Sequence, residues 1–247
     1  MRRISLSLLI LALLIGILAG CSPDKGTADE HFAQGNELAK QGSYTEAIQE
    51  YSRAISLNPA YAQVYYNRGL TYAILGDLES AITDFSAAIS LVPDFAEAYG
   101  NRGISYAMLN QPEAAIVDLS MAIRFNPQDA TSYYNRGITY YAMGQFEEAI
   151  ADFDTTLSFN PEDANIYYSR GNTYYEMGEL ELAIADNTEA IRLNPQLAEA
   201  YYHRGIAYKD AGDKARALAD FEKFISLTDS SVWINMARQQ IEELNQS

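Results

Sequence analysis

The sequence predicts an all-α protein, an α-solenoid of six helix pairs followed by a C-terminal capping helix. Two observations support this prediction. One stretch of the chain divides into six units of 34 residues without an insertion, and the same residue types return at the same positions of each unit. Such a period is typical of helical repeat arrays, in which stacked neighbours bury the apolar face that no unit buries alone. The predicted units are residues 28–61, 62–95, 96–129, 130–163, 164–197 and 198–231.

Three small or rigid residues recur with this period. The glycine at unit position 8 is Gly35, Gly69, Gly103, Gly137, Gly171 and Gly205. The alanine at position 20 is Ala47, Ala81, Ala115, Ala149, Ala183 and Ala217, and the proline at position 32 is Pro59, Pro93, Pro127, Pro161 and Pro195. A glycine inside a helix costs about 1 kcal/mol relative to alanine, so its repetition indicates that two helices approach closely there. We expect Gly137 to face Ala149, and each proline to end one pair before the next.

This pattern resembles the tetratricopeptide repeat (TPR) family over residues 28–231. The resemblance implies two helices per unit, split by a turn such as Leu75-Gly76-Asp77. It also implies that the first helix of each pair lines a concave groove, into which unit positions 2, 5, 6, 9 and 12 point. Residues 232–247 are expected to form a capping helix and tail, with Trp233 packed on the sixth unit.

Aromatic and polar residues occupy the positions that face the groove in this family. The predicted peptide-binding residues are Asn67, Asn101, Asn135, Tyr66, Tyr134, Tyr168, Tyr202, Tyr141 and Tyr175. A carboxamide both donates and accepts hydrogen bonds, so it can bind a peptide backbone at two places. Tyrosines add contact area at low entropic cost. The asparagines resemble the ladders of some TPR and armadillo-type grooves. In the alternative interpretation, these side chains only cap neighbouring turns or contact water.

The family's carboxylate clamp, which binds chaperone tails, is not expected here. The clamp needs basic residues at three positions of successive first helices, and the matching residues are Phe32, Glu97 and Asn101. Two of its asparagines have counterparts in Asn36 and Asn67, but every basic member is missing.

An arginine at unit position 7 and an aspartate at position 23 recur together in five units. The pairs are Arg68 and Asp84, Arg102 and Asp118, Arg136 and Asp152, Arg170 and Asp186, and Arg204 and Asp220. The first unit changes both residues, to Gln34 and Glu50. Their joint change predicts an ion pair between the two helices of a unit, repeated along the solenoid. The alternative is that the arginines bind an acidic ligand.

The N-terminal residues predict a lipoprotein signal. Two arginines precede an apolar run over residues 4–18, which is shorter than the roughly 20 residues of a membrane span and fits the apolar region of a secretory signal. The run leads into Leu18-Ala19-Gly20-Cys21, which resembles a bacterial lipobox. The resemblance implies removal of residues 1–20, acylation of Cys21 and a lipidated tether over residues 21–27. The alternative is an ordinary signal peptide with a chance cysteine.

Charge and composition limit the classes of partner. Residues 1–20 contain two of the 17 basic residues and none of the 33 acidic ones, so the remaining chain carries a formal net charge of −18 instead of −16. Such a surface repels nucleic acid and favours basic or neutral protein segments. With two histidines and a single cysteine, neither a Cys–His pair nor a metal cluster is expected. We expect no enzyme activity, no cofactor and no small-molecule substrate.

These features lead to two functional expectations. The first is a membrane-anchored scaffold or adaptor that binds envelope proteins or extended peptides in its concave groove. The second is a structural or assembly subunit, similar to a pilotin or to a non-catalytic subunit of a secretion or sugar-transfer complex, that uses its convex face. The expected location is the cell envelope: the outer membrane facing the periplasm where one exists, otherwise the outer face of the cytoplasmic membrane.

Overall fold

A computed structural model describes residues 26–246, and within this range it contains thirteen α-helices and no β-strand. In chain order the helices are α2 (Ala28–Lys40), α3 (Tyr44–Leu57), α4 (Ala62–Ile74), α5 (Leu78–Leu91), α6 (Ala96–Met108), α7 (Pro112–Phe125), α8 (Ala130–Ala142), α9 (Phe146–Phe159), α10 (Ala164–Glu176), α11 (Leu180–Leu193), α12 (Ala198–Asp210), α13 (Lys214–Leu227) and α14 (Ser231–Gln246). The predicted all-α solenoid is confirmed. The predicted signal segment and Cys21 lie outside the described residues.

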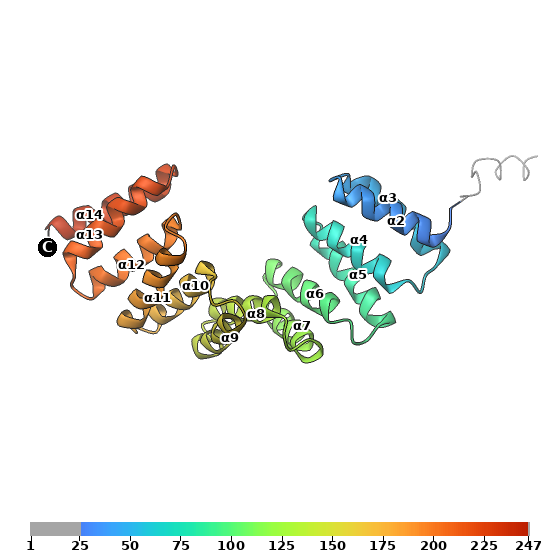
Figure 1. Cartoon of the computed structure of the whole chain (residues 1–247), viewed down its shortest axis with the longest axis horizontal. Helices are drawn as coiled ribbons and strands as arrows, with labels where there is room; N and C mark the ends of the chain where they lie inside the picture. The colour runs from blue at the N-terminus through green and yellow to red at the C-terminus, as the bar shows by residue number, and fades with distance from the viewer. Residues whose placement is uncertain (1–25, 247) are drawn as a thin grey trace, which may run out of the picture.

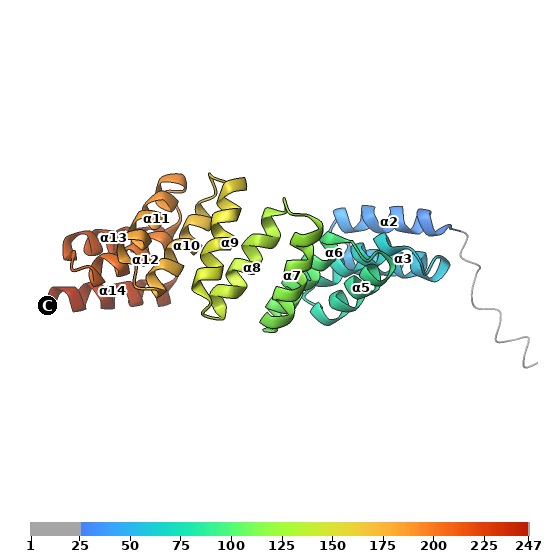
Figure 2. The same ribbon diagram turned by 90° about the horizontal axis from the view of Figure 1, so that it is seen from below.

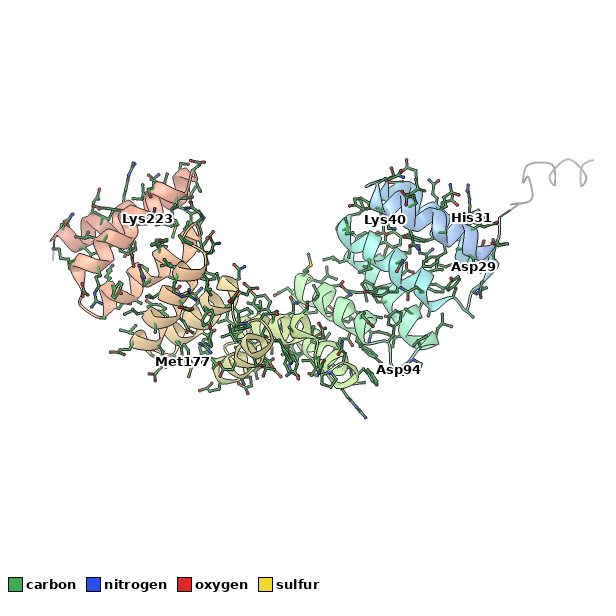
Figure 3. All side chains as sticks on the ribbon, in the orientation of Figure 1. Asp29, His31, Lys40, Asp94, Met177 and Lys223 are labelled. Atoms are coloured by element: carbon green, nitrogen blue, oxygen red, sulfur yellow. The ribbon has the colours of Figure 1, made fainter. Side chains whose placement is uncertain are left out.

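The helices stack as six antiparallel pairs that curve into an open arch (Figure 1). Along the long axis the pairs follow one another in chain order, with α2 and α14 at opposite ends (Figure 2). Successive first helices contact one another, α2 with α4 and so on to α10 with α12. The first helices α4 to α12 therefore lie toward the inside of the arch, and we call the surface that they form the inner face. His31 and Lys40 mark one end of the arch and Lys223 the other (Figure 3).

The turn inside a pair requires one residue with a positive φ. Five pairs place a glycine there, for example Gly144 with φ 74°. The third pair uses Asn110 instead, with φ 56°. Asparagine tolerates the left-handed region better than other residues with a Cβ, so the third turn keeps the same geometry as the others.

The two helices of a pair meet at the recurring glycine. A Cβ added to Gly137 would lie 2.9 Å from Cε1 of Phe153 and 3.3 Å from the carbonyl oxygen of Ala149. The expected partner, Ala149, is fully buried beside the glycine, but the nearest atoms belong to the ring of Phe153. The prediction that the glycine faces the alanine was therefore incomplete, because the larger side chain one turn later fills most of the space.

The last helix covers the open end of the sixth pair. Helix α14 packs against α13 and buries Ala237 and Leu244. Trp233 stays 44% exposed and lies edge-on to Tyr202, with ring centroids 5.8 Å apart. Between Gly26 and Gln246, no helix combines the length and the hydropathy that crossing a membrane would require.

Candidate functional site

Each of the five predicted arginine–aspartate pairs forms a two-pronged ion pair between the helices of a unit. In the fourth unit, Arg136 Nε donates to Asp152 Oδ2 and Nη2 donates to Oδ1, both at 2.8 Å. Asp152 is only 4% exposed, and the aspartates of the other four pairs are buried as well. Parallel hydrogen bonds between a guanidinium and a carboxylate are the strong form of this interaction.

The same arginines also reach the preceding unit. Arg136 Nη1 donates to Ser120 Oγ at 3.0 Å, and the rings of Tyr133 and Tyr140 lie 5.7 and 5.8 Å from its guanidinium carbon. The corresponding acceptors of the other arginines are Ser52, Ser86, Asp154 and Thr188. Each arginine therefore joins two successive helix pairs, and each of its three nitrogens already donates a hydrogen bond within the protein. This geometry favours the structural interpretation over the binding of an acidic ligand.

The first unit replaces this ion pair with a different buried pair. His31 Nδ1 lies 2.5 Å from Glu50 Oε2, and Arg53 Nη1 donates to Glu50 Oε1 at 2.6 Å. Both His31 and Glu50 are buried. We did not predict this contact. A signal for it was present, because the first unit departs from the repeat at positions 4, 7 and 23 together.

The three predicted asparagines lie on successive first helices but make mainly internal hydrogen bonds. Asn67 Nδ2 donates to Asn36 Oδ1 at 2.7 Å, and Asn101 Nδ2 donates to Tyr66 Oη at 3.1 Å. Asn135 Nδ2 donates to the carbonyl oxygen of Thr131 in its own helix, at 2.8 Å. Asn67 and Asn101 thus tie neighbouring first helices together, a role that neither expectation included. A peptide backbone would have to share these groups with the solenoid.

The tyrosines at unit position 5 also connect neighbouring pairs. Tyr134 Oη lies 3.2 Å from Ser169 Oγ, and its ring packs on Phe153. Tyr66 accepts the hydrogen bond from Asn101. In both cases the partner is unit position 6 of the next first helix, 35 residues later. These tyrosines are partly exposed and partly held in place, which suits a preformed contact surface.

The tyrosines at unit position 12 differ from one another. Tyr141 packs on Phe146 of its own unit, with ring centroids 5.9 Å apart. Tyr175 Oη donates to Asp210 Oδ2 at 2.6 Å, which links α10 to the end of α12. Burial and the hydrogen bond to Asp210 raise the pKa of Tyr175 to about 12. This hydroxyl is therefore a donor already used within the protein.

Cavities lie along the row of aromatic side chains, among them one in the third unit and one at the C-terminal end. In the third unit, position 5 is Gly100, and a cavity of about 210 Å³ lies there, bordered by Glu97 and Asn101. A second cavity, of about 110 Å³, lies at the C-terminal end between Tyr168 and Tyr202. Tyr202 is only 8% exposed, so most of its ring belongs to the core. A ligand could reach only the part of the ring that borders the cavity. Among residues 26–246, no histidine, cysteine or acidic side chains cluster as a metal site would require.

Comparisons with known proteins agree with this architecture. A family model described as TPR repeat matches residues 35–76, 106–144, 139–178 and 171–212, and two models described as tetratricopeptide repeat match residues 62–95 and 198–231. No enzyme family is indicated. The Hsp70-Hsp90 organizing protein of Triticum aestivum is 49% identical over 49 residues, which are 20% of this chain and 8% of that protein. The chain spans less than a tenth of the length of the curated relatives it matches.

Solved structures share the fold over most of the chain. MamA is 27% identical, with a TM-score of 0.65 over 70% of this chain and 94% of that one. YrrB, described as a TPR protein with an unusual peptide-binding site, is 21% identical, with a TM-score of 0.66 over 76% of this chain and 97% of its own. PilW, a type IV pilus biogenesis factor, is 20% identical, with a TM-score of 0.74 over 85% of this chain and 97% of its own. The last two likenesses concern the fold alone. Because the family model matches more than half of the residues and the helix pairs stack as its repeats do, this chain belongs to the tetratricopeptide repeat family.

Proposed function

We propose that this protein is a membrane-anchored scaffold that binds other proteins or extended peptides on the inner face of its solenoid. The observation that supports this most is the row of partly exposed tyrosines and asparagines that recurs along the first helices. Contacts between units hold Tyr66 and Tyr134 in place, so a ligand would find them already ordered. Ordered aromatic side chains lose little entropy on binding, which is why they dominate many protein interfaces.

The charge of the protein supports a preference for basic or neutral partners. Residues 21–247 carry a formal net charge of −18, and the inner face includes acidic side chains such as Glu97 and Glu199. A positively charged segment would be steered toward this surface, and its affinity would fall as salt is added. Nucleic acid, which carries phosphates, would be repelled.

The proposed anchor is a lipid on Cys21, which places the scaffold in the cell envelope. About seven residues separate Cys21 from α2, a reach of at most ~25 Å, so the arch would stay close to the bilayer. Depending on the organism, that bilayer is the outer membrane on its periplasmic side or the outer face of the cytoplasmic membrane. The substitution Cys21→Ser should abolish incorporation of a clickable fatty acid. Unchanged labelling of the variant would remove the anchor from the proposal.

The inner-face proposal is tested by co-purification after gentle detergent extraction. Replacement of Tyr134 and Tyr168 by alanine should reduce recovery of partners at least tenfold, with the helical circular dichroism signal unchanged. The matched control replaces Val117 and Leu182, exposed apolar residues of the second helices, by alanine. This control should leave partner recovery unchanged.

Partner loss in the Val117 and Leu182 variant, with normal recovery in the Tyr134 and Tyr168 variant, would favour the second candidate. That candidate is an assembly subunit that uses its outer surface. The exposed side chains on the second helices give that candidate its support, since Val117 is 62% and Leu182 46% exposed. One constant partner in fixed stoichiometry, lost only in the Val117 and Leu182 variant, would establish it over the adaptor.

A further inference from the structure

The cavity at the C-terminal end of the arch has an unusual lining. It encloses about 110 Å³, and its lining residues come mostly from α10, α12, α13 and α14. Figure 1 shows these helices in the C-terminal half of the arch. Five rings and one carboxylate carry the argument that follows: Tyr168, Tyr202, His203, Phe224, Trp233 and Glu199. We call this arrangement the aromatic cage. Four of its members occupy unit positions 2, 5 and 6, which face the inside of the arch: Glu199, Tyr168, Tyr202 and His203.

Several rings of the cage meet edge to face, whereas Tyr202 and Phe224 are tilted by 53°. His203 lies edge-on to Tyr168 and to Tyr202, with interplanar angles of 77° and 79° and centroids 5.5 and 5.6 Å apart. Trp233 is edge-on to Tyr202 at 77°. Five rings from four helices line the cavity, so aromatic surface borders the space on more than one side. Phe224 and Tyr202 are buried, whereas Trp233 is 44% exposed and stands at the rim.

The electrostatic character of the cage is negative. Glu199 is exposed at its edge, and its charge acts on both Tyr168 and His203. Burial lowers the pKa of His203, so this imidazole is neutral at pH 7 and does not repel a cation. Lys209, whose charge also acts on Tyr202, is bound to Glu243 and Gln240, both at 2.6 Å. Among the residues that the structure describes, no lysine or arginine lines the cavity.

We propose that the aromatic cage binds the cationic side chain of a lysine or arginine presented by the partner protein. The faces of aromatic rings attract cations, and an adjacent carboxylate adds a charge partner at the rim. The volume suits one alkyl stem with its charged head. The proposal rests on the proposed function for the source of that side chain, and it adds which residue type the C-terminal end of the inner face recognises.

The cage can be tested without knowledge of the partner. Trp233 is the only tryptophan of the chain, so its fluorescence reports on this cavity. The probes are N-acetyl-arginine amide, N-acetyl-lysine amide and the uncharged arginine analogue N-acetyl-citrulline amide. Both cationic probes should produce a saturable change in emission, with apparent affinity at least fivefold higher than that of the citrulline probe. Equal affinity for the arginine and citrulline probes, or no saturable change with any probe, would overturn the proposal.

Variants assign the effect to the cage. Glu199→Gln should lower the affinity for the two cationic probes at least fivefold and leave the affinity for the citrulline probe unchanged. The matched control is Glu97→Gln, which occupies the same unit position beside Gly100, where no cage exists. Unchanged binding to Glu199→Gln, or equal losses in the two variants, would refute the assignment. Equal urea-unfolding midpoints would show that both variants are folded.

Failure of this proposal is separable from failure of the scaffold proposal. The amide probes need only the cage, so they would bind even if no protein occupied the inner face. Suppose that partners are recovered and that this recovery depends on Tyr134 and Tyr168, but that no amide probe binds. The scaffold proposal would then stand, and the proposal for the aromatic cage would be overturned.

Discussion

The ion pair between Arg136 and Asp152 offers the sharpest test of how the repeats are held together. The substitution Arg136→Leu removes two hydrogen bonds at 2.8 Å and leaves the carboxylate of Asp152 4% exposed without its cation. Loss of one partner of a buried pair costs roughly 3–5 kcal/mol. The Arg136 side chain is itself 19% exposed, so we expect the lower end of this range, about 3 kcal/mol.

A double-mutant cycle separates the interaction from the effects of each residue. Replacement of Arg136 and Asp152 by leucine together should recover most of the loss, because no buried charge is then left unpaired. The expected coupling is about 2 kcal/mol, within the range measured for residues in direct contact. Urea unfolding followed by circular dichroism gives the free energies, provided that the slope with urea stays constant across the variants.

Two further measurements test whether the effect is specific to the buried pair. Arg192 forms an exposed pair with Glu189 one turn away, and its replacement by leucine should leave the unfolding midpoint unchanged. Arg136→Leu should also weaken the contact between the fourth and third units, because Arg136 Nη1 donates to Ser120 of the third unit. We therefore expect faster amide hydrogen exchange in α7 and α8. Additive effects of the two single substitutions would refute the idea that this pair joins the helices.

Three other predictions follow from single contacts. Gly137→Ala should destabilise the protein by roughly 1–3 kcal/mol, measured by urea unfolding. The reason is that the new Cβ would lie 2.9 Å from the Phe153 ring and 3.3 Å from the backbone oxygen of Ala149. An unchanged free energy of unfolding would show that the two helices can separate there. Burial lowers the pKa of His203 below its unfolded value of about 6.5, so the unfolded chain binds a proton more readily and stability should fall as pH drops below that value. His203→Gln should remove this part of the pH dependence in melts between pH 7.5 and 5, and an identical slope in the variant would contradict the assignment. Asn101→Ala should cost about 1 kcal/mol of unfolding free energy through the lost bond to Tyr66, and a variant as stable as the parent would show that this bond does not stabilise the stacking of the units.

The sequence by itself determined the features that recur within a unit. The glycine and alanine of each repeat, with a proline in five of the six, established the 34-residue period and with it the solenoid. The pairing of Arg136 with Asp152 was also predictable, because both members return in five units and change together in the first. Contacts inside a repeat act at the same positions every time, so they leave a periodic signal in the chain.

Only the tertiary structure decided the contacts between units. Asn101 meets Tyr66 across 35 residues, whereas the corresponding contact of Tyr134 is a serine and that of Tyr168 a histidine. Because the partner changes from unit to unit, no repeated pattern reveals it. The aromatic cage depends further on Trp233, which lies outside the repeats altogether and reaches Tyr202 only through the packing of α14 on the last pair. Residues far apart in the chain come together there because the stacking of helices, rather than the spacing of residues, brings their rings into contact.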